Sequence, residues 1–255
     1  MKTILKVAIL PALLLALASA AFADSITIKS SGCSASPCTN GALQYLGYTP
    51  GTFSLPYNTP LVAGTIPSGS AASYDVDSNG VWANAIAGSS WVSNSSDAGP
   101  SGSGNPDDGK VVDPNGFYYY DTTFTAVGGT EKYNGSISVM ADDTAEVILN
   151  AGTADQVVLV PFGIVGSDSH CGTGSSLNGA DPLPSCGGAD TVSLSDITLL
   201  AGTNTLTIIN AQTGLAGAGV DFTAELTQTP EPTSLLLLGT GLLGLAGMLR
   251  RKLRA

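Results

Sequence analysis

Apolar and polar side chains alternate with a period of two along much of the second half of the chain. In Gly135–Asp143, apolar Ile137 and Val139 alternate with serines, and Phe117–Val127 is rich in the aromatic and β-branched residues that suit a half-buried strand. Similar segments are Ala145–Gly152, Gln156–Ile164, Thr191–Leu200, Thr205–Gln212 and Gly219–Thr227. No stretch between the two ends of the chain keeps a helical period for long. The pattern predicts an all-β fold, an antiparallel β-sandwich of short strands.

Turn signals divide these strands. Asp142-Asp143-Thr144 predicts a turn, with Ala145–Gly152 as the strand that returns beside Gly135–Asp143. Pro161 interrupts Gln156–Ile164, which predicts an edge strand or a bulge. Two earlier segments, 25–32 and 43–51, are expected to supply the first strands, and Asn94–Pro114 is expected to form a long polar loop.

The N-terminal segment is predicted to be a signal peptide. Lys2 and Lys6 precede the apolar stretch Val7–Ala18, and small residues follow up to Ala21-Phe22-Ala23. This order of a charged region, an apolar region and an A-x-A site is typical of secretory signals. We therefore expect cleavage before Asp24, with Ala18-Ser19-Ala20 as the second choice.

The C-terminus carries a second apolar run. Ser234–Leu249 holds sixteen residues without a charge, which as a helix would span roughly 24 Å, somewhat less than a bilayer core. Four cations follow directly, and they favour a transmembrane helix whose basic end is cytoplasmic. The alternative is a buried core helix, which has no need of a basic end. Those cations are Arg250, Arg251, Lys252 and Arg254.

Pro230-Glu231-Pro232, the apolar run and the basic tail together resemble the PEP-CTERM sorting signal of Gram-negative bacteria. The resemblance implies export through the inner membrane, anchoring by the C-terminal helix, and recognition by an exosortase, a membrane cysteine peptidase. Such proteins usually come from species that secrete exopolysaccharide, which implies a place on the cell surface or in a biofilm matrix. The expected parts are a signal peptide (1–23), a β-sandwich ectodomain (24–228) and the sorting segment (229–255) with its transmembrane helix at 234–249.

The order of strands and turns between residues 91 and 227 resembles a galactose-binding-domain-like jelly roll. The resemblance rests on an acidic turn after SISVMADD and on the AGTNTL turn before the last strands. The chain departs from the pattern at Asn150-Ala151-Gly152, where an inserted alanine separates the usual Asn-Gly pair. The resemblance implies a sandwich that binds carbohydrate without acting on it.

Charge narrows the choice of partners. Between Asp24 and Thr229 the chain has three basic residues and nineteen acidic residues, which give a net charge of −16. This balance argues against binding nucleic acid or anionic lipid, because both require Lys and Arg to neutralise phosphate. It is compatible with neutral polysaccharide, with divalent cations, or with solubility alone.

Four cysteines suit an exported protein. Cys33 lies close to Cys38, and Cys171 and Cys186 flank a loop rich in Gly, Ser and Pro. An even number of cysteines in an oxidising compartment indicates disulfides. Three pairings are open, and we expect the local one, 33–38 with 171–186. The alternative interpretation is that the cysteines form a zinc site, although the C-x-x-C spacing is absent.

Candidates for catalysis are few, so we expect no enzyme. His170 is the only histidine and adjoins Cys171. A glycosidase needs two carboxylates across a cleft, and the clusters available are Asp142-Asp143 with Glu146, and Asp107-Asp108. Adjacent turn residues more often serve turn geometry. No cofactor is expected, although Asp142, Asp143 and loop oxygens are hard ligands that suit calcium.

Aromatic side chains are the other candidates, because sugars stack on exposed rings. Trp91 and Tyr119 flank the polar loop 94–114, and we include them with Asp142 and Asp143 as ligand-binding candidates. Tyr119 should face away from Tyr118 and Tyr120 on the same strand. Three classes of function remain: a surface protein that binds glycan, a structural sandwich that contacts other proteins, and, least favoured, a glycoside hydrolase.

Overall fold

The structure is a computed structural model. It describes residues 24–32, 43–51, 64–78, 82–99, 112–127, 129–162, 189–212 and 217–229, together with 239–241, 244, 248, 250 and 251. Ile26–Leu226 forms one compact unit, and a second unit combines Met1–Ser25 with Thr227–Ala255. The sandwich lies in the first of these units.

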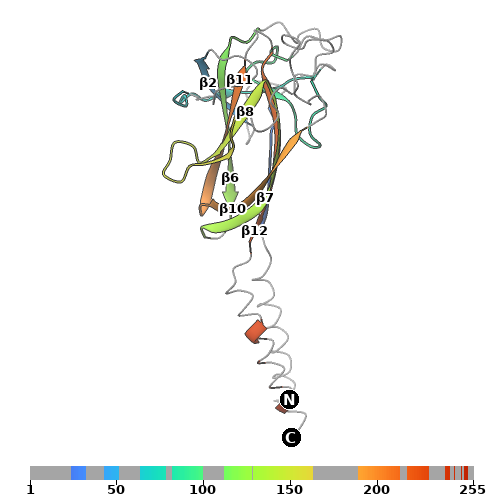
Figure 1. Ribbon diagram of the computed structural model, residues 1–255, viewed down its shortest axis with the longest axis vertical. Helices are drawn as coiled ribbons and strands as arrows, with labels where there is room; N and C mark the ends of the chain where they lie inside the picture. Colours follow the sequence, from blue (N-terminus) through green and yellow to red (C-terminus); the bar gives the residue numbers. More distant parts are fainter. Residues whose placement is uncertain are drawn as a thin grey trace, which may run out of the picture. The chain divides into compact units, whose positions relative to one another are not determined.

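Twelve strands are found among the described residues (Figure 1). They are β1 (Ser25–Lys29), β2 (Gln44–Pro50), β3 (Ala71–Ala72), β4 (Tyr74–Asp75), β5 (Val92–Ser93), β6 (Gly116–Ala126), β7 (Glu131–Asp142), β8 (Thr144–Leu149), β9 (Val157–Val160), β10 (Asp190–Leu199), β11 (Gly202–Gln212) and β12 (Gly219–Gln228). The sequence-based prediction of an all-β fold with antiparallel strands is confirmed.

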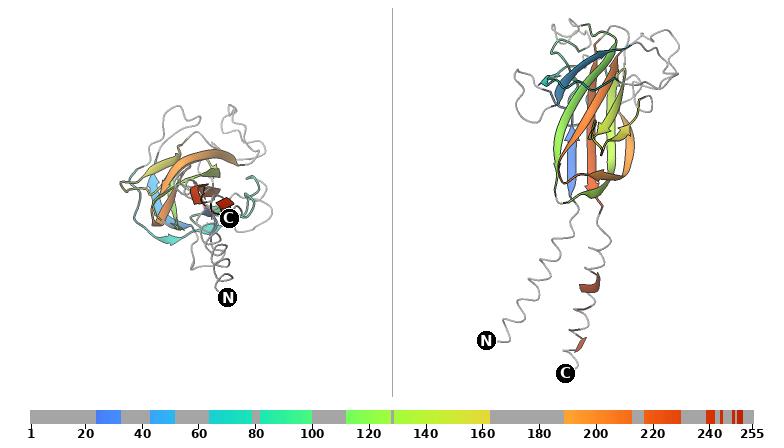
Figure 2. Two further views of the ribbon diagram at one scale, coloured as in Figure 1. Left: turned by 90° about the horizontal axis from the view of Figure 1, so that it is seen from below. Right: turned by 90° about the vertical axis from the view of Figure 1, so that its left-hand side faces the viewer.

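The strands form two sheets. Sheet A has the order β10-β7-β12-β5-β4, with β1 also paired to β12, and sheet B has the order β3-β2-β6-β11-β8-β9. In sheet B, β2, β6 and β11 lie side by side in antiparallel register, as the right panel of Figure 2 shows. Strand β1 is antiparallel to β12, because the Gln228 N–H donates to the Asp24 carbonyl and the Ser30 N–H donates to the Phe222 carbonyl.

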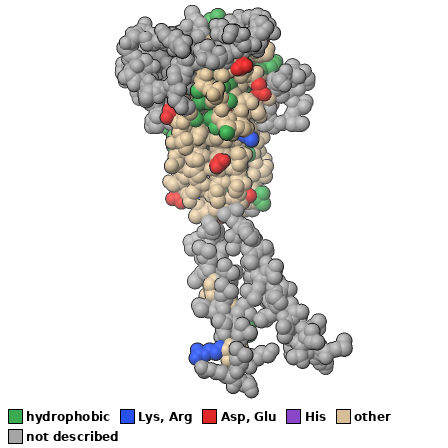
Figure 3. Space-filling model, turned by 90° about the vertical axis from the view of Figure 1, so that its right-hand side faces the viewer, with side chains coloured by type: hydrophobic (Ala, Val, Ile, Leu, Met, Phe, Trp, Pro, Cys, Tyr) green, Lys and Arg blue, Asp and Glu red, His purple; other side chains and the backbone are tan. Residues whose placement is uncertain are grey.

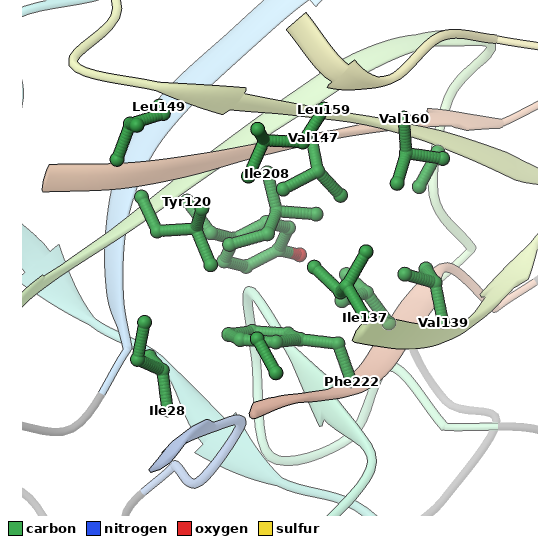
Figure 4. Close-up of a cluster of buried hydrophobic side chains, with 14 of the residues drawn as sticks. Ile28, Tyr120, Ile137, Val139, Val147, Leu149, Leu159, Val160, Ile208 and Phe222 are labelled. Atoms are coloured by element: carbon green, nitrogen blue, oxygen red, sulfur yellow. The ribbon is translucent and has the colours of Figure 1, made fainter. Parts of the chain in front are cut away.

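A continuous core fills the space between the sheets. Figure 4 shows Ile137, Val139 and Phe222 of sheet A pointing toward Val147, Leu149 and Ile208 of sheet B. These side chains occupy alternate positions of their strands, so the period of two in the sequence places them on one face. Burial of this apolar surface is the main force that holds the sheets together.

Strand β6 is buried on both faces. Tyr118 and Tyr120 belong to the core between the sheets, whereas Tyr119 belongs to a second cluster on the outer face of sheet B. The predicted opposition of Tyr119 to its neighbours is therefore confirmed. The second cluster also holds Phe117 and Ile209, against which Ile66 and Phe162 pack.

The predicted hairpin across Asp142–Thr144 is wrong. Strand β7 ends at Asp142 in sheet A and β8 begins at Thr144 in sheet B, where it pairs with β11 and β9 instead. Asp143 alone joins the two strands, and its N–H donates to the Ala211 carbonyl at 3.0 Å. The chain therefore changes sheets at a sharp corner, and the acidic residues take part in the interior rather than in an exposed turn.

Other predicted segments agree with the structure within a few residues. β9 is an edge strand and ends just before Pro161, and its register against β8 shifts between Val147 and Ile148. Segments 25–32 and 43–51 contain β1 and β2. Strand β7 starts at Glu131, four residues earlier than predicted. The described ends of the predicted loop 94–114 include buried Ala98 and Asp113, so the loop is not polar surface throughout.

Several expectations fall outside the described residues. They concern the signal peptide, the four cysteines and their pairing, His170, and Asp107-Asp108. Gly239, Thr240 and Gly241 are helical, but most of the predicted span 234–249 is not described. Within the part of the chain that is described, no helix has the length and apolar character needed to cross a membrane.

Candidate functional site

A groove of about 680 Å³ lies on the outer face of sheet B. Its floor follows from strand alternation: Tyr119 points outward from β6, so Asp121 does too, and Thr207 is its register partner on β11. We call this the outer groove. It is lined by Leu46, Ile66, Pro67, Ser68, Gly69, Asp121, Asn150, Ala151, Gly152, Thr153, Asp155, Leu200, Thr203, Thr205 and Thr207.

One wall of the outer groove is the turn after β8. Asn150 has a positive φ of 50°, and its carbonyl accepts hydrogen bonds from the Thr153 N–H at 3.2 Å and the Thr153 hydroxyl at 2.8 Å. The Gly152 N–H donates to Gln156 Oε1 at 2.7 Å. Asparagine tolerates this left-handed conformation better than most residues, and glycine adopts it freely. Asn150-Ala151-Gly152 therefore forms a turn even though the usual Asn-Gly pair is interrupted.

Hydrogen bonds of the Asn150 side chain also fix the turn to β11. Asn150 Nδ2 donates to Asn204 Oδ1 at 3.1 Å, and Asn150 Oδ1 accepts the Thr205 N–H at 2.9 Å. Both asparagines are buried. Because Thr205 lines the groove, this pair of side chains holds the wall and the floor in one arrangement.

The opposite wall is the segment 66–69, which runs against β2. A side chain on Gly69 would collide with the carbonyl oxygen of Leu46, so only glycine permits this close approach. Ile66 packs against the outer cluster that contains Tyr119, and Leu46 does the same. The wall thus places two apolar side chains beside the polar floor.

Asp121 is the carboxylate on the floor of the groove. It is half-buried, and this desolvation raises the pKa of its carboxyl above the ordinary value. Three threonines of β11 also line the groove, of which Thr203 is exposed, Thr205 is half-buried and Thr207 is buried. The arrangement offers hydrogen-bond acceptors and donors next to apolar contacts, which suits an uncharged ligand rich in hydroxyl groups.

Trp91 and Tyr119 are not surface residues, so the expectation that they offer exposed rings to a sugar is wrong. Their exposed fractions are 1% and 0%. The Trp91 ring packs 4.5 Å from Trp82, and its Nε1 donates to the Ala83 carbonyl at 2.8 Å. The Tyr119 hydroxyl is hydrogen-bonded to the Thr49 hydroxyl at 2.9 Å. Both rings are buried because further segments cover the outer faces of the sheets, which strand alternation alone does not reveal.

Asp142 and Asp143 lie together at the corner between the sheets, and each is only 1% exposed. Asp142 Oδ2 accepts the Trp82 Nε1–H at 2.7 Å. Neither residue lines the outer groove. The structure thus brings these two candidates together, but at a distinct place from Asp121. Glu146, the third member of the predicted cluster, is half-buried opposite Ile209 of β11, and burial raises its pKa.

Two further carboxylates are buried, and the sequence did not single them out as candidates. Asp113 accepts hydrogen bonds from Asn94 Nδ2 at 3.0 Å and from the Ala218 N–H at 2.8 Å, and burial raises its pKa to about 6. Asp221 accepts the Ser30 hydroxyl and the Ile86 N–H, each at 2.7 Å, and burial raises its pKa too. Asp113 was not recognised because it lies in the segment 94–114, which was expected to form a polar loop. Asp221 was visible as an acid within an apolar strand.

Charged side chains are sparse among the described residues on the face drawn in Figure 3. Figure 3 shows the side opposite to that of the right panel of Figure 2, where acidic side chains are scattered and apolar ones gather toward the upper end. Among the described residues, no group of three or more His, Cys, Asp or Glu side chains is placed to hold a metal ion.

Among curated proteins, none matches. Among solved structures, the chain is similar to the crystal structure of a GH26-CBM35 β-(1,4)-mannanase from Podospora anserina, with 17% identity and a TM-score of 0.26 over 63% of this chain. The match spans 28% of the mannanase chain. A family model does match the C-terminal segment: residues 228–252 are a PEP-CTERM protein-sorting motif, as the sequence analysis expected, and they mark the chain as an exported protein processed by an exosortase.

Proposed function

We propose that the chain is a non-catalytic protein of the cell surface or extracellular matrix whose jelly-roll sandwich binds a neutral polysaccharide in the outer groove. The sorting motif at residues 228–252 supports the route to the surface. The groove supports the binding, because Asp121 and the threonine hydroxyls of β11 stand beside apolar Leu46 and Ile66. This combination on one concave face is the observation that carries the proposal.

The chemistry of a sugar matches these groups. Each sugar hydroxyl both donates and accepts hydrogen bonds, and the Asp121 carboxylate accepts strongly while the threonines do both. The C–H faces of a pyranose ring contact apolar side chains such as Leu46 and Ile66. A net charge of −16 between Asp24 and Thr229 favours a neutral polymer over a polyanion. In this proposal the ligand is the exopolysaccharide of the cell that exports the protein.

One observation favours a second function, a structural sandwich that contacts other proteins. The edge strand β9 exposes Val157 and Val158, at 37% and 44%. An exposed apolar edge offers backbone groups and side chains for pairing with another strand. In this alternative, the outer groove binds no glycan.

The test is a binding measurement with the purified full chain in detergent. A panel of neutral and acidic polysaccharides would be titrated by calorimetry, and the release of reducing ends would be followed in parallel. The proposal predicts saturable binding to a neutral polysaccharide without release of reducing ends. Binding to none of the panel would contradict glycan recognition, and release of reducing ends would establish a hydrolase.

Variants locate the binding. Thr203→Val and Thr205→Val keep the shape and β-propensity of their strand but remove a hydroxyl from the groove floor. Each is expected to weaken binding by about 1 kcal/mol, the net value of a typical hydrogen bond. The matched control is Thr198→Val on β10, which does not line the groove and should bind as the wild type does.

A further inference from the structure

The threonines of the outer groove belong to a larger array on the same sheet. Thr203 and Thr205 of β11 line the groove, and their register partners on β6 are Thr125 and Thr123. These two partners do not line the groove itself. Two adjacent strands therefore carry two successive cross-strand pairs of threonine. We call these four residues the threonine grid.

All four side chains of the threonine grid point away from the core. Their neighbours along the strands, Phe124, Ala126 and Leu206, pack in the core between the sheets or against it. The threonines occupy the alternate positions of β6 and β11, so they lie on the outer face of sheet B. Three of them are exposed, and Thr205 is half-buried. Their hydroxyl groups can therefore reach a ligand on that face.

The threonine grid continues the floor of the outer groove along the strands. Asp121, on the groove floor, lies two residues before Thr123 on β6, so both side chains face the same way. At about 3.3 Å per residue, the distance along β6 from Asp121 to Thr125 is roughly 13 Å. Neighbouring strands are only about 4.8 Å apart. The floor and the grid together form a strip that is longer than it is wide.

The chemistry of the threonine grid suits a sugar polymer. Each hydroxyl donates and accepts hydrogen bonds, each methyl group offers an apolar contact, and the four side chains carry no charge. Identical groups at a regular spacing match a ligand whose own groups repeat, as those of a linear polymer do. Threonine is also a common strand residue that adds modestly to sheet stability. Valine serves that structural purpose equally well, so substitution by valine separates the two roles.

We propose that the ligand of the outer groove is a linear neutral polysaccharide that lies along β6 and β11 and extends from Asp121 over the threonine grid. This inference rests on the proposed function, and it adds the direction and the minimum length of the ligand. A short oligosaccharide binds at the Asp121 end, where apolar Leu46 and Ile66 line the same groove. Further sugar units then lie over the grid and gain hydrogen bonds there. The affinity therefore rises with chain length until the strip is filled.

The first experiment titrates the full chain in detergent with oligosaccharides from the disaccharide to the hexasaccharide. They are prepared by partial hydrolysis of the neutral polysaccharide that binds. The affinity measured by calorimetry is expected to rise by roughly tenfold or more along the series and then to level off, because each added hydrogen bond contributes about fivefold. Equal affinity for short and long oligosaccharides would overturn the inference and leave binding in the groove intact. Binding to no polysaccharide of the panel would overturn both proposals.

Variants assign the effect of chain length to the threonine grid. Thr125→Val removes a hydroxyl at the end of the grid away from Asp121. It is expected to weaken binding of the hexasaccharide by about fivefold and to leave the affinity for the disaccharide unchanged. Thr205→Val, in the groove itself, should weaken the binding of both. Thr27→Val is the matched control, because Thr27 is an exposed threonine of β1 in sheet A, and it should bind both ligands as the wild type does.

The melting temperature separates binding from a structural role of the same residues. The double variant Thr123→Val, Thr125→Val should melt as the wild type does, because valine has a β-propensity similar to that of threonine. Its affinity should no longer rise with the length of the oligosaccharide. An unchanged length dependence in the double variant would overturn the inference. An equal loss of affinity for the disaccharide and the hexasaccharide would also overturn it, because the grid would then not contact the added sugar units.

Discussion

Asn204 shows how one buried side chain determines the shape of a turn and of the outer groove. Its Oδ1 accepts hydrogen bonds from the Leu200 N–H at 2.9 Å and from Asn150 Nδ2 at 3.1 Å, while its Nδ2 donates to the Leu200 carbonyl at 2.9 Å. No other side chain of this size offers a donor and an acceptor in that arrangement. The asparagine of AGTNTL therefore has a structural role, which links β10 to β11 and the turn after β8.

The first prediction concerns this asparagine. Asn204→Ala leaves the Leu200 N–H, the Leu200 carbonyl and Asn150 Nδ2 without their partner, so the free energy of unfolding should fall by about 2–4 kcal/mol. Urea denaturation followed by circular dichroism measures the loss. The neighbouring Thr203→Ala, an exposed position, should change stability by no more than about 0.5 kcal/mol. Similar midpoints for the two variants would contradict this role.

At the scale of the element, strand positions follow from sequence more directly than their assembly. β6, β10, β11 and β12 lie where their alternation placed them, because burial of one face imposes a period of two. The assignment of β7 and β8 to different sheets could not be predicted, since a one-residue corner and a tight hairpin both present acidic turn residues. Pro161 did predict the edge strand β9, because proline cannot serve a central ladder.

The candidate site could likewise be predicted from the sequence only in part. The threonines at 203, 205 and 207 occupy every second position, which predicts that they share one face of a strand. Asp121 lies two residues after Tyr119, which predicts that both side chains point to the same side of β6. Their meeting in one groove required the walls formed by residues 66–69 and by the turn after Asn150, which come from distant parts of the chain. Trp91 and Tyr119 were misassigned because the second cluster and the Trp82 contact bury their rings on faces that usually meet solvent.

The second prediction belongs to the edge strand β9. Val160 is fully buried in the core between the sheets, whereas Val158 is 44% exposed. Val160→Ala should lower the free energy of unfolding by about 2 kcal/mol through lost apolar burial and a small cavity. Val158→Ala is the matched control and should cost about 0.5 kcal/mol or less. Equal losses in chemical denaturation would show that β9 does not pack as described.

At the scale of the whole molecule, burial of acids sets the response to pH. Asp113 has its pKa raised to about 6, and the carboxyls of Asp121 and Asp221 are shifted in the same direction by desolvation. Unfolded carboxyl groups titrate near pH 4 (about 3.9 for Asp). The folded state thus binds more protons between about pH 4 and pH 6, so stability falls as the pH rises through this window.

The third prediction follows from that sign. In calcium-free buffer the chain should be more stable at pH 5 than at pH 7, and Asp113 alone should contribute about 1 kcal/mol of the difference. Repulsion within the acidic ectodomain acts in the same direction. Urea midpoints measured at both pH values, for the wild type and for Asp113→Asn, test this. A lower urea midpoint at pH 5 than at pH 7 in the wild type would contradict the prediction. An equal difference between the two midpoints in Asp113→Asn would contradict the role of Asp113.

For the molecule as a whole, we propose that the exported sandwich binds polysaccharide through the outer groove. The most direct test is the affinity of the full chain for a neutral polysaccharide, compared between the wild type and Asp121→Ala, with the melting temperature of each as the check on folding. Removal of a half-buried carboxylate should leave the melting temperature unchanged or higher, because its desolvation is relieved. The affinity of the variant is expected to be about tenfold weaker, because it loses a hydrogen bond to a charged group. Equal affinity in two equally stable proteins would contradict it.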